Sequence, residues 1–180
     1  NESSPRWAPA GGWFAFTSNR EGAAGDSKQQ LFLMRADGGE ARRITNAKEG
    51  VSTYAFSKDG QWLVYRSGKA SEEQLYALAM ASLDRGTPVD SLTPTQLTKH
   101  ATGVGSWELA PDSRRIYFIT ADTVDTDEKT RVEKKFTVAV RNAETSINSL
   151  WMVDLASASR PTTRVTRDTS LAVTAFQIAP

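Results

Sequence analysis

Cysteine is absent from the 180-residue chain, and histidine occurs only once, as His100. The lack of cysteine excludes disulfides, thiolate metal sites and cysteine nucleophiles. A single histidine excludes metal sites built from several histidines. An excess of charge of one sign is also missing, because 22 basic residues face 21 acidic ones, and this balance argues against nucleic-acid binding. No apolar run approaches the roughly 18 residues of a membrane span.

The composition nevertheless supports a folded core. Hydrophobic residues make up 39% of the chain and charged residues 24%, which is the range of globular domains, and the length predicts one domain. Residues 1–7 contain no initiator Met, basic n-region or apolar h-region. We therefore expect the chain to be a piece of a larger protein, and no compartment can be assigned from it.

An internal repeat organises the sequence. Three segments align without gaps from Pro5, Tyr54 and Trp107, and a fourth starts at Phe176, so that the starts are 49, 53 and 69 residues apart. In each copy a short alternating apolar run leads into a turn rich in Asp, Gly or Pro, followed by a second apolar run. The two runs are always seven residues apart, as in the pairs Trp7 and Phe14, Phe56 and Leu63, and Leu109 and Ile116.

Each copy continues with two more strand-like segments. The third strands begin at Leu31, Leu75 and Leu150, and the short fourth strands are 43–45, 96–98 and 164–166. Four antiparallel strands in a unit of about 40–50 residues are typical of a β-propeller blade. A sandwich or an open barrel is the alternative, but neither requires a regular repeat.

The pattern predicts an all-β protein, a partial β-propeller with three four-stranded antiparallel blades plus the first strand of a fourth. The predicted blades are residues 4–46, 52–99 and 105–167, and the extra strand is 173–180. An insertion at 121–146 lengthens the third unit, and we expect it to cover one face, with residues 136–140 in an extra strand pair. Residues 71–81 are rich in helix formers. The repeat register nevertheless predicts a strand from Gln74 to about Met80.

The repeat resembles the TolB-like propeller repeat. Its usual form is W-S-P-D-G-K-x-I-A-F-x-S, then L-Y-x-M-x-x-D-G-G, then R-x-L-T. Residues 7–11, 16–20, 31–39 and 43–45 follow this form closely, and 56–60 and 109–113 follow it with single departures. Such repeats occur in TolB and in the N-terminal propellers of the prolyl oligopeptidase family of serine peptidases, including acylaminoacyl-peptidase-like members. Residues 38–45 and 149–155 look most like the peptidase group.

This resemblance implies a non-catalytic role. In that peptidase family the propeller caps a separate α/β-hydrolase domain and restricts access to its active site. The nucleophile elbow G-x-S-x-G belongs to the hydrolase domain, and the nearest string here, Gly103-Val104-Gly105-Ser106-Trp107, has Ser106 in the wrong place. We therefore expect a gating domain that is not itself an enzyme, with a linked hydrolase domain as partner. A TolB-like protein-interaction propeller without a linked enzyme is the alternative.

No residue is assigned as catalytic, cofactor-binding or metal-binding, and no cofactor is expected. His100 is interpreted as an exposed loop histidine, because a Ser-His-Asp triad needs an acid and a nucleophile beside it. The acidic run 122–128 lacks the glycine of a calcium loop and is followed by basic residues. It is interpreted as a solvated insertion, with a weak cation site as the alternative.

The remaining candidates also have structural interpretations. Trp7, Trp62, Trp107 and Trp151 fall on repeat-aligned strand positions, and Trp13 aligns with Trp62, so blade-to-blade packing is expected to explain all five. The pairs Arg42-Arg43 and Arg114-Arg115 could bind an acidic partner but are interpreted as solvated edge charges.

An open arc of three blades would leave apolar faces uncovered on its end blades. We expect either Trp13 and Ala15 or Phe14 and Phe16 to face water on the first blade, and we expect the chain to self-associate through such faces.

Overall fold

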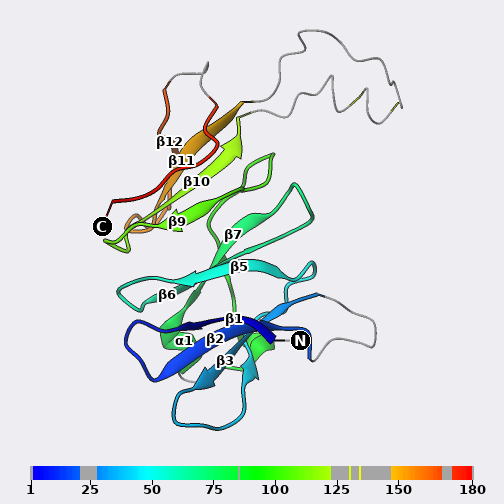
Figure 1. The fold of residues 1–180 in the computed structure, drawn as a ribbon, viewed down its shortest axis with the longest axis vertical. Helices are drawn as coiled ribbons and strands as arrows, with labels where there is room; N and C mark the ends of the chain where they lie inside the picture. Colours follow the sequence, from blue (N-terminus) through cyan, green and yellow to red (C-terminus); the bar gives the residue numbers. More distant parts are fainter. Residues whose placement is uncertain are drawn as a thin grey trace.

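Three four-stranded antiparallel sheets follow one another along the chain and lie one above another along the long axis of the molecule (Figure 1). The structure, a computed structural model, describes residues 2–20, 28–84, 86–122, 130, 134, 147–167 and 172–179. Each sheet contains four consecutive strands in sequence order, so each repeat forms one blade. The predicted all-β partial propeller with three four-stranded blades is therefore confirmed.

The strands take the order that the repeat predicts. Blade 1 contains β1 (Glu2–Trp7), β2 (Trp13–Ser18), β3 (Gln30–Arg35) and β4 (Arg42–Arg43). Blade 2 contains β5 (Val51–Phe56), β6 (Trp62–Ser67), β7 (Gln74–Ala79) and β8 (Thr95–Gln96). Blade 3 contains β9 (Trp107–Leu109), β10 (Arg115–Ala121), β11 (Asn148–Asp154) and β12 (Thr162–Arg164).

The constant seven-residue spacing becomes the register of the first hairpin in every blade. Trp7 lies opposite Phe14, Phe56 opposite Leu63, and Leu109 opposite Ile116. The turns between these strands use positive backbone φ at Gly60 (+68°) in blade 2 and at Ser113 (+57°) in blade 3. Glycine adopts that conformation without steric cost. The turn residues thus fix the register that places the apolar side chains on matching faces.

The helix-forming segment of blade 2 divides as the register predicts. Residues 74–79 form β7, and the helical tendency is expressed only afterwards, in the short helix α1 (Met80–Asp84). Met80 and Leu83 of this helix are buried. A single-turn 3₁₀ helix (Val89–Ser91) follows before β8.

The core consists of two layers, each between neighbouring blades. Between blades 1 and 2, Leu31 and Leu33 pack with Leu63 and Tyr65. Between blades 2 and 3, Val64, Leu75 and Ala77 join the following apolar side chains of blade 3: Ile116, Phe118 and Val153. Blade 2 is therefore apolar on both sheet faces, as expected for a sheet that is covered on both sides.

A recurring threonine joins the third and fourth strands. The backbone N–H of Leu31 donates to Thr45 Oγ1 at 2.8 Å, that of Leu75 to Thr98 Oγ1 at 2.9 Å, and that of Leu150 to Thr166 Oγ1 at 3.2 Å. These are the threonines of the R-x-L-T signature. The fourth strands β4, β8 and β12 begin one or two residues earlier than the segments predicted for them. The predicted segments end at the threonine, which continues the pairing through its side chain after the strand has ended.

The same backbone hydrogen bond to the preceding blade recurs at the entries to blades 2 and 3. Val51 N–H donates to Gln29 O at 2.7 Å, and Val104 N–H donates to Glu73 O at 2.7 Å. Val173 N–H repeats this contact with Asn148 O at 2.8 Å. The C-terminal segment 172–179 thus enters the position of a fourth blade, alongside β9 (Figure 1).

The predicted extra strand at 173–180 is nevertheless not formed as a strand. Residues 172–179 pair with no other strand among the described residues, because a first strand pairs only within its own blade. No helix of the described residues is long and apolar enough to cross a membrane. The predicted insertion at 121–146, with its strand pair at 136–140, lies almost entirely outside the described residues.

Candidate functional site

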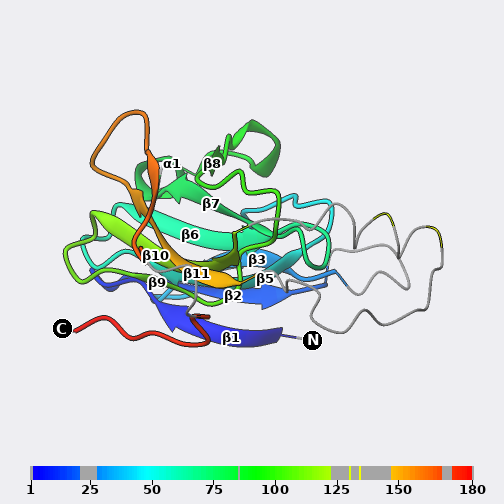
Figure 2. The same ribbon diagram turned by 90° about the horizontal axis from the view of Figure 1, so that it is seen from above.

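The first strand of each blade has one unpaired edge. β1, β5 and β9 each pair with a single neighbour, and β1, β9 and the C-terminal segment lie on one side of the molecule, away from β8 and α1 (Figure 2). A groove of about 510 Å³ opens there between blades 2 and 3. We call it the inner groove; residues 53–56 and 105–109, with Arg6, Lys58 and Arg66, line it.

Hydrogen bonds between blades hold the walls of the inner groove. The indole N–H of Trp107 donates to Thr53 Oγ1 at 2.8 Å. The guanidinium of Arg66 donates to the carbonyls of Val104 and Gly105 at 3.1 and 2.6 Å. It also forms an ion pair with Glu73 at 3.4 Å. The hydrogen bonds of Trp107 and Arg66 fix both sides of the groove against each other, and the ion pair holds Arg66 within blade 2.

The rim of the inner groove carries positive charge. Arg6 lies over the ring of Tyr54, 5.8 Å from its centroid, and the exposed Lys58 forms no hydrogen bond or ion pair with a described residue. Burial raises the pKa of Tyr54 to about 12, and its hydroxyl lies 2.6 Å from Ala15 O. The carboxylate of Glu108 accepts the backbone N–H of Ile178 at 3.3 Å. The groove can therefore contact an extended chain through side chains and unpaired strand edges.

The interpretation of His100 as an exposed loop residue is wrong. Its ring is half-buried and meets the rings of Phe118 and Trp151 edge-on, with centroids 5.3 and 4.7 Å apart. Burial lowers the pKa of His100, and the nearby Asp122 partly opposes this effect. The repeat indicated that position 100 is held in place. His100 follows Thr98 as Ala47 follows Thr45, and the backbone N–H of each donates to the side chain of the glutamine that begins the third strand of its blade.

The acidic run is only partly solvated. Asp122 receives hydrogen bonds from Arg164 and Ser149, both at 2.7 Å, and from the indole of Trp151 at 3.3 Å. It is therefore a structural anchor of blade 3. Residues 123–128 lie outside the described residues.

The tryptophans largely follow the prediction of packing between blades. Trp13, Trp62, Trp107 and Trp151 pack against the two core layers. Trp7 does not, since it is 64% exposed at the end of β1 and its ring meets that of Phe14 in its own blade, at 5.4 Å between centroids.

The arginine pairs differ from each other. Arg114 and Arg115 are exposed, as predicted. Arg42 is not a solvated edge charge, because it lies over the ring of Trp13 at 5.9 Å and donates to Thr87 O of blade 2 at 3.2 Å. Burial lowers the pKa of Arg42.

The described residues contain no group of three His, Asp or Glu side chains placed to hold a metal ion. Ser106 lies in the inner groove, whereas His100 packs among aromatic rings, and no hydrogen bond links the two within the described part of the chain. Arg6 and Lys58 could not be identified from the sequence as groove residues. The groove that they line forms only when the blades stack, and the repeat pattern does not specify that stacking.

Comparisons with known proteins place the chain among propellers. No family model matches it. Over 86 residues it is 36% identical to the uncharacterized peptidase YuxL of Bacillus subtilis (strain 168), a match that covers 48% of this chain and 12% of that protein.

Solved structures agree on the fold. TolB from Agrobacterium tumefaciens superposes with a TM-score of 0.57 at 15% identity, over 92% of this chain and 50% of that one. The acylaminoacyl peptidase of Pyrococcus horikoshii superposes with a TM-score of 0.55 at 14% identity, over 89% of this chain and 24% of that one. The chain thus has the propeller fold of TolB and of peptidase propeller domains, and it spans half or less of these relatives.

Proposed function

We propose that this chain is the non-catalytic propeller part of a serine peptidase of the prolyl oligopeptidase family, and that it gates substrate access to a separate hydrolase domain. The observation that carries the proposal is the 36% identity over 86 residues with a peptidase. The inner groove supports it. Its walls are fixed between blades, and its unpaired strand edges suit an extended peptide that passes along them.

The first test concerns catalysis by the 180-residue chain itself. The purified chain should not hydrolyse acyl-peptide or p-nitrophenyl substrates, because no nucleophile elbow occurs in the sequence and His100 is held among aromatic rings. The proposal would be overturned if the chain hydrolysed these substrates and if replacement of one of its serines abolished that hydrolysis.

The second test concerns gating in the complete gene product. A fluorophosphonate probe should label a serine outside residues 1–180. Trp107→Ala, which removes a wall of the inner groove, should raise hydrolysis of long peptides relative to dipeptide substrates. The matched variant Trp7→Ala, at an exposed position of blade 1, should leave that ratio unchanged.

A TolB-like interaction propeller without a linked enzyme is the second candidate. It is favoured by the superposition on TolB over 92% of this chain. Absence of any serine labelling in the complete gene product would favour this candidate over the peptidase.

A further inference from the structure

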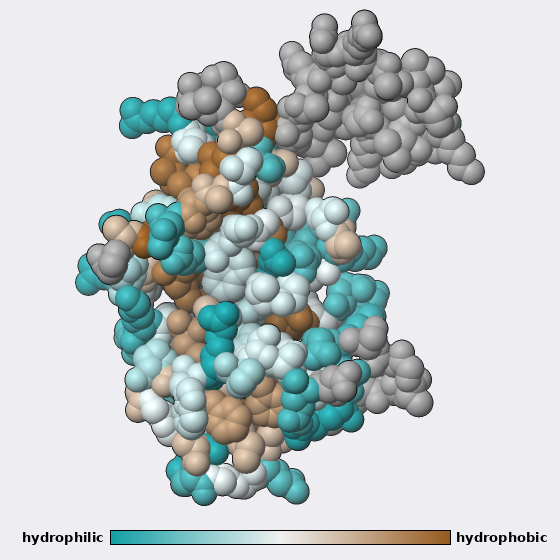
Figure 3. Space-filling view, in the orientation of Figure 1, coloured by the Kyte–Doolittle hydropathy of each residue, from teal (hydrophilic) through white to brown (hydrophobic). Residues whose placement is uncertain are grey.

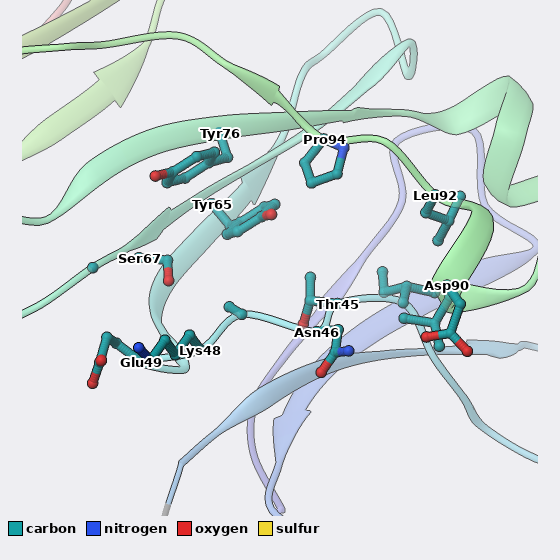
Figure 4. A pocket seen from close by; sticks show the side chains of 14 residues that line it. Thr45, Asn46, Lys48, Glu49, Tyr65, Ser67, Tyr76, Asp90, Leu92 and Pro94 are labelled. Carbon is teal, nitrogen blue, oxygen red and sulfur yellow. The ribbon is translucent and has the colours of Figure 1, made fainter.

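A second cavity, of about 440 Å³, lies where blade 1 is followed by blade 2 (Figure 4). Its walls come from the linker 44–49, from the end of β6, from Tyr76 of β7 and from the segment 89–94. We call it the Tyr65 pocket. It is separate from the inner groove, with which it shares no lining residue.

Tyr65 gives this pocket an unpartnered polar group. The residue is only 4% exposed, and its ring stacks on Tyr76 with centroids 5.5 Å apart. Its hydroxyl forms no hydrogen bond with any described residue, whereas the hydroxyl of Tyr54, a residue that is 3% exposed, lies 2.6 Å from a carbonyl. The hydroxyl therefore remains free to donate to a ligand or to water inside the pocket.

The Tyr65 hydroxyl can act as a hydrogen-bond donor. The phenol is protonated at neutral pH, as in an ordinary tyrosine, and burial raises the pKa of Tyr65 further. Asn46 adds further donors, because its Oδ1 already accepts from Arg43 at 2.7 Å and its amide N–H groups remain. A ligand in this pocket therefore needs acceptor oxygens.

The charged groups of the Tyr65 pocket stand at its two ends. Lys48 lies beside Glu49 at one end, and Asp90 lies beside Leu92 at the other (Figure 4). Neither Lys48 nor Asp90 forms a side-chain ion pair with a described residue, whereas Glu49 lies 3.8 Å from Lys28. Ile44, Leu92 and Pro94 also line the pocket and contribute apolar side chains to it.

We propose that the Tyr65 pocket binds short peptides with two free termini and an apolar side chain. The peptide carboxylate faces Lys48, its ammonium group faces Asp90, and a backbone carbonyl accepts the Tyr65 O–H. The apolar side chain packs on Ile44, Leu92 and Pro94.

The separation of the two charges selects the ligand class. Lys48 and Asp90 lie at opposite ends of the pocket (Figure 4), whereas a single amino acid carries its ammonium and carboxylate on one carbon. Each added residue moves these two charges apart by roughly 3.3–3.6 Å. A ligand with charge of only one sign would pair with either Lys48 or Asp90, but not with both. The inference rests on this chain alone and does not depend on the proposed gating role.

The test measures peptide binding to the complete 180-residue chain by calorimetry and thermal unfolding. Leu-Leu and Leu-Gly-Leu with free termini should bind, and at about 100 times Kd they should raise Tm by roughly 5–10 °C. Free leucine and the same peptides acetylated and amidated should bind at least fivefold more weakly.

Variants separate a ligand contact from a structural role. Tyr65→Phe should weaken peptide binding about fivefold, while the Tm of the free protein stays close to that of the wild type, because the hydroxyl bonds to no described residue. Lys48→Gln and Asp90→Asn should each weaken binding. The controls Lys99→Gln and Tyr117→Phe lie outside the pocket and should not change it.

Three results would overturn the proposal. The first is that neither peptide with free termini binds at millimolar concentration, which would mean that only water fills the pocket. The second is that the acetylated and amidated peptides bind as tightly as the free ones. The third is that the Tyr65→Phe protein without ligand has a lower Tm than the wild type, which would mean a structural role for the hydroxyl. None of these results bears on whether the complete gene product is a peptidase, which the serine-labelling experiment decides.

Discussion

His100 shows how a single side chain couples pH to the interface between blades 2 and 3. Its ring packs edge-on against Phe118 and Trp151, and its backbone bonds reciprocally with Gln74 of blade 2 at 3.1 and 3.2 Å. An imidazolium at this place would lose hydration that the aromatic rings replace poorly.

We expect this histidine to make the fold less stable in mild acid. Burial lowers the pKa of His100 below its ordinary value of 6.5, so that the unfolded chain binds more protons than the folded one. Stability should therefore fall as pH drops through 6.5 and level off below the folded-state pKa. Thermal unfolding between pH 7.5 and 5 should show a larger loss of Tm in the wild type than in His100→Gln. Equal losses would contradict this explanation.

Gly103 is a second residue whose identity is dictated by its surroundings. A Cβ at this position would lie 2.7 Å from the backbone carbonyl of Ser71 and 2.9 Å from the N of Glu72. Backbone atoms cannot yield as a flexible side chain would, so Gly103→Ala should lower the free energy of unfolding by about 1–3 kcal/mol. The control Gly105→Ala, where the nearest atom is 3.3 Å away, should cost less in urea unfolding. A neutral Gly103→Ala would show that the blade 2–3 junction can move apart.

Among the elements, the pairing of the third and fourth strands is extended by one threonine hydroxyl in each blade. Thr98 is 1% exposed and accepts the N–H of Leu75 at 2.9 Å. Thr98→Val keeps the shape but leaves that N–H unpaired, and it should cost about 1–3 kcal/mol in chemical denaturation. Thr163→Val on the exposed side of β12 is the control and should be close to neutral. A Thr98→Val protein as stable as the wild type would mean that another acceptor serves Leu75.

Strand number, order and first-hairpin register could be predicted from the sequence, because the seven-residue spacing depends only on local geometry. Trp7 and Phe14, seven apart, are direct partners in the sheet. The contacts between blades could not be predicted in this way. Arg42 reaching Thr87, or His100 meeting Trp151, depends on the distance and angle between blades. The pockets also depend on how the blades stack, since their linings come from more than one blade.

For the molecule as a whole, we expect from the sequence that the outer apolar face of each end blade is exposed to water, and the structure differs from this expectation. Ala15 is 0% exposed against blade 2, and Phe16 on the outer face is 5% exposed, beneath the guanidinium of Arg20 at 5.1 Å. Trp7 at one end and Val165 at the other remain exposed. Apolar surface also gathers over blade 3 and the C-terminal segment (Figure 3).

We expect this remaining surface to cause weak self-association. Sedimentation equilibrium at micromolar concentrations should show a monomer in exchange with a larger species, because apolar side chains and the unpaired segment 172–179 can be covered by a second copy. Trp7→Ser should weaken the association, whereas Gln61→Ser on the exposed turn of blade 2 should not. A strictly monomeric, well-folded species at all concentrations would contradict this expectation.

The repeated bond from Val51, Val104 and Val173 to the preceding blade has a consequence for how such a protein changes in evolution. Blades 2 and 3 each share this backbone contact and an apolar layer with the preceding blade, so within the described residues the placement of a blade depends on its neighbours. Stability is then close to a sum of terms for single units and for adjacent pairs. Duplication or loss of one unit alters only the two junctions beside it. The number of repeats can therefore change by recombination while every surviving unit keeps its sequence.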